Sequence, residues 1–117
     1  MLVENDERLD DALRYIEKAV EAVPNNPGFL DTYAYVLYKN GKFPQAAEYV
    51  AAALQQYEQD GVLPPAEVYE HMGMIKEKLG AKEQALDAYE QALEIGVDKL
   101  SAKERERIKR AVERLSQ

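Results

Sequence analysis

The stretch LDTYAYVLYKNGKFPQAAEYVAAAL, residues 30–54, contains two helical patterns separated by a turn. In each pattern apolar residues recur every three or four positions, as they do along one face of an α-helix. Gly41 can end the first helix, because glycine adopts a left-handed backbone conformation without a Cβ clash. Pro44 can open the second, because the first turn of a helix leaves its N–H groups unpaired anyway. The stretch therefore predicts a helix–turn–helix unit.

The second helix of this unit has two counterparts elsewhere in the chain. Each counterpart places small residues around one larger residue at the same spacing. The three tracts are Ala12, Ile16 and Ala19; Ala46, Val50 and Ala53; and Ala85, Tyr89 and Ala92. The second and third tracts lie five residues further apart than the first and second. An insertion within residues 58–64 explains the difference, because surface loops absorb added length at little cost.

The first helices of the two complete units also correspond, since each carries a small residue near its centre and ends at a glycine. The whole pattern resembles the tetratricopeptide repeat (TPR) over about residues 6–96. The resemblance implies an all-α superhelical solenoid of about six helices, with small residues where the helices of one repeat cross. The residues expected to meet there are Ala34 with Ala46 and Gly73 with Ala85. Lys76 departs from the family pattern, which usually has an aromatic residue there, and Val97 replaces its closing proline.

The resemblance divides one domain, residues 1–117, into four segments. The expected segments are the second helix of a truncated repeat (5–26), two complete repeats (27–58 and 65–97) and a C-terminal capping helix (98–117). Ser101, with Glu104 three residues later, forms a capping box that begins the last helix. Because solenoid ends need a polar cap, the truncated first repeat leads us to expect the C-terminal part of a longer bacterial TPR protein. Alternatively, residues 9–23 self-associate, in a homodimer or a head-to-tail stack.

Composition and charge exclude several other classes of protein. Hydrophobic residues make up 46% and charged residues 32% of the chain, the balance of a soluble folded domain. No apolar run reaches the roughly 20 residues that span a bilayer. The net charge of −7 argues against general nucleic-acid binding, which needs concentrated Lys and Arg. The compartment stays open between cytoplasm and periplasm, because a chain without cysteine gives no redox indication.

The sequence offers no constellation for catalysis or for a cofactor. It has no cysteine, which excludes thiolate nucleophiles and Cys-based zinc sites, and it has one histidine. Glu67 and His71 lie one helical turn apart, but two ligands fall short of the three or four that zinc takes from a protein. We therefore expect His71 to be an ordinary helix-surface residue. We expect neither an enzyme nor a bound cofactor or metal.

In TPR proteins the first helix of each repeat lines a concave groove that binds peptides, and the resemblance implies this role for two helix faces. The expected groove residues are Asp31, Tyr35, Tyr38, Lys39, Glu67, Glu70, Met74, Glu77 and Lys78. Family members that bind chaperone C-termini use a Lys/Asn clamp, whereas these faces offer acidic residues and tyrosines, so we predict no carboxylate clamp. Acidic residues with Tyr and Met favour a basic, partly apolar protein or peptide partner. The alternative is a face that is merely solvated.

Overall fold

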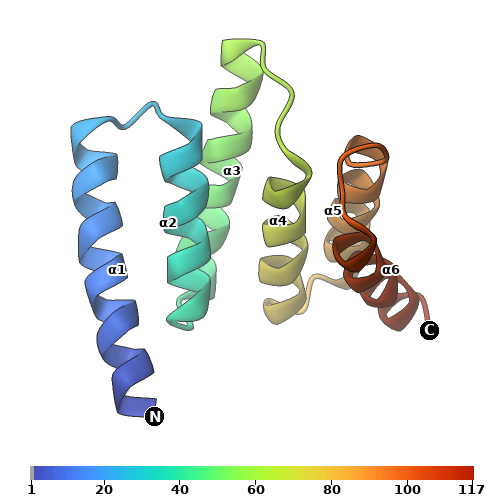
Figure 1. Ribbon diagram of the computed structural model, residues 1–117, viewed down its shortest axis with the longest axis horizontal. Helices are drawn as coiled ribbons and strands as arrows, with labels where there is room; N and C mark the ends of the chain where they lie inside the picture. Colours follow the sequence, from blue (N-terminus) through green and yellow to red (C-terminus); the bar gives the residue numbers. More distant parts are fainter. Residues whose placement is uncertain (1) are drawn as a thin grey trace. The chain divides into compact units, whose positions relative to one another are not determined.

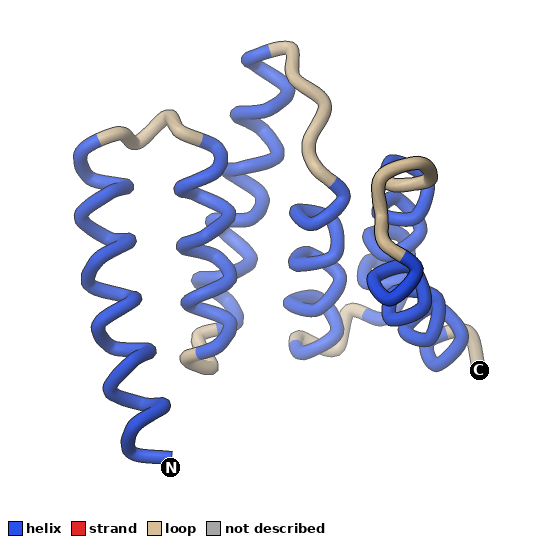
Figure 2. Tube along the Cα trace, viewed as in Figure 1, coloured by secondary structure: helices blue, strands red, loops and turns tan. Residues whose placement is uncertain are grey.

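The computed structural model describes the backbone of residues 2–117 and the side chains of residues 8–117. The described residues form helices joined by turns and loops, without a strand (Figure 1, Figure 2). The helices are α1 (Leu2–Ala22), α2 (Pro27–Lys39), α3 (Phe43–Asp60), α4 (Ala66–Lys78), α5 (Lys82–Ile95) and α6 (Ala102–Leu115). Over the described residues, no helix is both long and apolar enough to cross a membrane. The all-α prediction is confirmed.

The chain divides into two compact units, called below the N-terminal unit (Met1–Val62) and the C-terminal unit (Leu63–Gln117). In the N-terminal unit α2 packs against α3, and α1 packs against α2 (Figure 1). In the C-terminal unit α4 packs against α5, which in turn contacts α6. The pairs α2–α3 and α4–α5 are the helix–turn–helix units that the sequence pattern predicts.

Small residues let α2 and α3 pack closely in the N-terminal unit. Ala34 of α2 and Ala46 of α3 are both fully buried, as expected where two helix backbones approach each other. Gly41 forms the turn between them with a φ of 77°, which a residue with a Cβ rarely adopts. At the other end of α2, the Asn26 side chain caps the helix by accepting a hydrogen bond of 3.1 Å from the backbone N–H of Phe29.

The core of the C-terminal unit forms around Tyr89 of α5. This residue is 3% exposed, and its ring lies so close to Gly73 of α4 that a Cβ added there would be 2.8 Å from it. A glycine inside a helix costs about 1 kcal/mol relative to alanine, and this close approach explains why one is present. Ala85 and Ala92, one turn away on either side, are fully buried in the same core. The repeated small residues therefore lie where the sequence pattern places them.

The last helix, α6, covers this core with an apolar stripe. Its buried residues are Ile108, Ala111 and Leu115. The predicted capping box is present, because Ser101 Oγ accepts a hydrogen bond of 3.1 Å from Glu104 N–H and Glu104 Oε1 accepts one of 2.9 Å from Ser101 N–H. The hydrogen bonds from the Ser101 backbone and hydroxyl hold the pKa of Glu104 below its usual value. α6 therefore begins at a defined residue and packs its apolar face against the core of the C-terminal unit.

Two helices of the N-terminal unit are longer than the sequence pattern suggested. α1 begins at Leu2, whereas the truncated repeat was expected to begin near residue 5. α3 continues to Asp60, so the expected loop over residues 58–64 is partly helical. Its added turn contains neither Gly nor Pro, and nothing in it opposes a helix. Gly61, with a φ of 69°, then ends α3.

The small-residue stripe of α1 is partly covered. Ile16, at its centre, is 6% exposed, and Ala12 and Ala19 are half-buried. The packing of α1 against α2 contributes to this burial. Among the described residues of α1, Tyr15 is a large apolar side chain that stays 79% exposed, and Val23, which follows the helix, is 47% exposed.

Candidate partner-binding surface

An aromatic cluster, Tyr35, Tyr38 and Phe43, lies at the C-terminal end of α2 and the start of α3. The two tyrosine rings stack with centroids 6.3 Å apart and planes inclined by 20°. The Phe43 ring lies 5.7 Å from that of Tyr38. Lys39, which is exposed, places Nζ 5.8 Å from the centroid of the Tyr35 ring. Asp31, two turns before Tyr38, is 8% exposed and offers a ligand little surface.

This aromatic cluster has the properties of a binding surface rather than of a core. Its three rings are half-buried, so each keeps part of its surface in water. Tyrosine contributes a large contact area with few rotatable bonds, which makes it a frequent anchor in protein interfaces. The Lys39 ammonium above a ring adds a cation that can interact with a ligand carboxylate or carbonyl. The cluster therefore suits a partly apolar peptide segment.

The acidic face of α4, in the C-terminal unit, is paired with arginines of α6. Glu70 is 8% exposed and accepts two hydrogen bonds from Arg107, from Nε at 2.7 Å and from Nη2 at 2.9 Å. Glu77 accepts hydrogen bonds from Arg114 Nε and Nη2, the shortest being 2.7 Å, and one of 3.1 Å from the Tyr89 hydroxyl. The bond with Glu77 raises the pKa of Arg114 above its usual value. Two of the expected groove carboxylates are therefore compensated within the unit.

Sequence reasoning missed this contribution of α6. The helix carries a basic stripe beside a depression of about 480 Å³. Its lining residues are Lys103, Glu106, Arg107, Arg110 and Arg114. A signal was present in the spacing, because Glu70 and Glu77 are seven residues apart, as are Arg107 and Arg114. Two helices that pack side by side can match such pairs, since seven residues make about two turns.

The remaining α4 residues of the expected groove differ in exposure. Glu67 and Lys78 are exposed, whereas Met74 is half-buried against the core of the unit. His71 is 8% exposed, with Nε2 3.6 Å from Glu67 Oε1. The expectation of a helix-surface histidine was therefore wrong. The physical reason is that the buried residues of α4 lie on two opposite sides of the helix rather than along one stripe.

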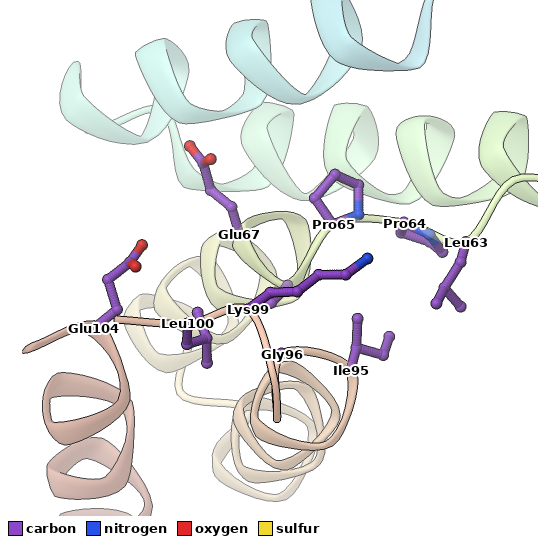
Figure 3. Close-up of a pocket in the computed structure, with 10 residues that line it drawn as sticks. Leu63, Pro64, Pro65, Glu67, Ile95, Gly96, Lys99, Leu100 and Glu104 are labelled. Atoms are coloured by element: carbon purple, nitrogen blue, oxygen red, sulfur yellow. The ribbon is translucent and has the colours of Figure 1, made fainter. Parts of the chain in front are cut away.

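A separate cavity of about 270 Å³, called below the end pocket, lies at one end of the C-terminal unit (Figure 3). The segment before α4 and the turn after α5 form its walls. Its lining residues are Leu63, Pro64, Pro65, Ala66, Glu67, Ile95, Gly96, Lys99, Leu100 and Glu104. The sequence pattern predicted an insertion in the first of these segments and no cavity. Its role in a cavity depends on a distant turn, which no local pattern reveals.

Comparison with known protein families shows which family this helical array belongs to. A family model described as tetratricopeptide repeat matches residues 29–96, more than half of the chain and the whole span from near the start of α2 to the end of α5. The chain belongs to the tetratricopeptide repeat family. The TPR resemblance read from the sequence is thus confirmed, and the matched region holds both helix–turn–helix pairs. No curated protein sequence matches the chain significantly.

Solved TPR domains share the fold of this chain. The first TPR domain of Spaghetti (RPAP3), bound to an HSP90 peptide, is 19% identical, with a TM-score of 0.75 over 97% of this chain and 84% of that one. The Sgt2 TPR domain from Aspergillus fumigatus is also 19% identical, with a TM-score of 0.76 over 98% and 70% of the two chains. The N-terminal domain of STI-1 from C. elegans is 17% identical, with a TM-score of 0.72 over 99% and 87%. At these identities the likeness establishes the TPR fold alone.

Proposed function

We propose that this TPR chain is a protein-interaction module that binds a peptide segment or partner protein on the α2 face or the α4 face named above. The main support for the proposal is the half-exposed aromatic cluster on α2, with Lys39 above the Tyr35 ring. Large aromatic side chains are costly to leave in water without a binding partner, and they are enriched at interface hot spots. The peptide bound to the similar RPAP3 domain supports a role of this kind.

The proposed ligand is partly apolar where it contacts the aromatic cluster. A basic ligand group would be drawn to Glu67, the exposed carboxylate of the α4 face. Glu70 and Glu77 attract such a group less, because Arg107 and Arg114 already compensate them. The absence of a carboxylate clamp remains a prediction.

Affinity capture with the Tyr35→Ala, Tyr38→Ala double variant tests this proposal. We expect the native chain to retain a partner from a lysate of the source organism, and the double variant to retain at least about tenfold less, because interface hot spots contribute about 2 kcal/mol or more each. Tyr15→Ala is the matched control, since Tyr15 is 79% exposed on α1, outside the aromatic cluster. It should capture the partner as the native chain does. Mass spectrometry measures the retained amounts.

Equal capture by the native chain and the double variant would exclude the aromatic cluster as the binding surface. Circular dichroism of each variant shows whether its helices remain folded. The rings are half-buried and lie outside the residues that make the α2–α3 crossing, so the double variant should keep its helix content. A loss of capture with intact helices would then report on the surface itself.

Self-association through residues 9–23 is the second candidate function. It is favoured by two exposed apolar side chains in this segment, Tyr15 at 79% and Val23 at 47% exposure. The main proposal predicts a constant mass of 13.3 kDa in sedimentation equilibrium over a wide concentration range. A mass that rises with concentration, and that returns to the monomer value in Tyr15→Asp, would instead support self-association.

A further inference from the structure

The end pocket combines an apolar lining with a defined shape. Leu63 at its rim is 68% exposed. Pro64 and Pro65 restrict the backbone on one side, because proline fixes φ. The turn after α5 is tightly packed on the other side, since a Cβ added at Gly96 would lie 2.5 Å from the Leu100 side chain. The pocket is thus formed by restrained segments of the C-terminal unit.

The volume of the end pocket limits what can occupy it. Sites for drug-sized ligands usually span about 300–1,000 Å³, and this cavity measures about 270 Å³. One or two side chains from a peptide fit that size better than a whole cofactor. The apolar residues at its rim and walls, Leu63, Pro65 and Ile95, favour an aliphatic side chain.

Charge in the end pocket is distributed unevenly. The Lys99 side chain extends toward Leu63, Pro65 and Ile95, whereas the carboxylates of Glu67 and Glu104 lie toward the other end (Figure 3). Glu104 already accepts the Ser101 N–H in the capping box. The ammonium group is therefore the charge that the apolar end of the pocket presents to a ligand.

We propose that the end pocket binds an aliphatic side chain of a partner segment, with an adjoining carboxylate paired to Lys99. The carboxylate follows from charge complementarity, since an ammonium beside apolar surface attracts an anion that brings its own apolar group. A nucleic acid is disfavoured, because its binding needs many phosphate contacts and the pocket lining holds one cation. The proposal rests on the proposed function, because it assumes that the chain binds a protein or peptide partner.

The test uses N-acetyl-L-leucine as a probe, because it joins an aliphatic side chain to a carboxylate. We expect titration of the ¹⁵N-labelled chain to shift the amide signals of Ala66, Gly96 and Leu100 in a saturable way. N-acetyl-L-leucinamide, which lacks the charge, should bind less tightly. Lys99→Glu should weaken binding of N-acetyl-L-leucine about fivefold, the effect of a partly exposed ion pair. Leu63→Ser should weaken it as well, through lost apolar contact.

Two variants serve as matched controls for these substitutions. Lys109→Glu makes the same charge change at an exposed lysine of α6 that does not line the pocket. Val97→Ser removes an exposed apolar side chain from the turn after α5, and Val97 does not line the pocket. Both should bind N-acetyl-L-leucine like the native chain. Leu63 and Lys99 are exposed, so their variants should fold, and the amide spectrum of each shows directly whether they do.

Three results would overturn the proposal. They are the absence of saturable shifts at the pocket, equal binding of the acid and the amide, and equal weakening by Lys99→Glu and Lys109→Glu. Saturable shifts confined to the aromatic cluster would also refute the pocket, while leaving the proposed function intact. Conversely, pocket binding together with unchanged capture by the Tyr35→Ala, Tyr38→Ala variant would refute the aromatic surface and retain the pocket as a ligand site.

Discussion

Replacing Tyr89 with alanine should lower the free energy of unfolding of the C-terminal unit by about 4 kcal/mol, as removal of large aromatic residues from cores does. Tyr89 is 3% exposed, and its ring occupies the space left by Gly73. Gly73 has no side chain that could turn into the resulting cavity, and Ala85 and Ala92 are too short to fill it. Urea titration followed by circular dichroism would measure the loss.

Tyr89→Phe separates the contribution of the ring from that of the hydroxyl. It keeps the packing and removes the hydrogen bond of 3.1 Å to Glu77, so we expect a cost of about 1 kcal/mol. Glu77 would still accept hydrogen bonds from Arg114 and would not be left unsatisfied. Equal costs for the alanine and phenylalanine variants would show that the ring is not the centre of the core. In that case the repeat register inferred from the sequence would lose its physical basis.

The repeat could be predicted from the sequence because helix crossings impose a local requirement. Two helices joined by a short turn approach closely only where small residues face each other. Ala34, Ala46, Ala85 and Ala92 satisfy that requirement at fixed spacing, and all four are fully buried. Glycines with positive φ, such as Gly41, then place the turns. Both signals lie within a few residues of the structure that they determine.

The chemistry of the candidate site could be predicted only in part. The spacing of Tyr35 and Tyr38 placed them on one face of a helix, and their rings do stack. The spacing of Glu70 and Glu77 placed them correctly on one face of α4, but a helical period does not reveal which helix packs beside that face. Pairing with α6 depends on a contact across 37 positions of sequence. The sequence-based preference for a basic ligand therefore counted carboxylates whose charge is already compensated.

His71 and the end of α3 were mispredicted for related physical reasons. Burial of His71 depends on what covers α4 from several sides, and a single amphipathic stripe describes only one of them. The end of α3 depends on a balance between helix propensity and loop entropy over residues 58–60, which contain no breaker. Small differences in free energy decide where a helix ends. They do not decide whether a long periodic helix forms.

Replacing Ile108 with alanine should destabilise the C-terminal unit by about 3 kcal/mol, within the range for buried isoleucine. Ile108 is 1% exposed and belongs to the buried face of α6, together with Ala111 and Leu115. The Arg107 and Arg114 side chains are both more than half exposed, so their ion pairs add little stability by themselves. We therefore expect apolar burial, rather than charge, to hold α6 in place. Urea titration would measure the change. The control is Val112→Ala, at a half-buried position of the same helix, which should cost about 1 kcal/mol.

Loss of Ile108 packing should also change what α4 presents to solvent. If α6 loosens, Glu70 and Glu77 lose the arginines that compensate them, and the acidic face expected from the sequence is uncovered. Limited trypsin digestion would detect the loosening as faster cleavage at Lys103 and Arg105, both within α6. Unchanged cleavage and a cost below that of Val112→Ala would mean that the ion pairs suffice to dock the helix. α6 would then be held by charge, and high salt rather than core mutation would be the way to release it.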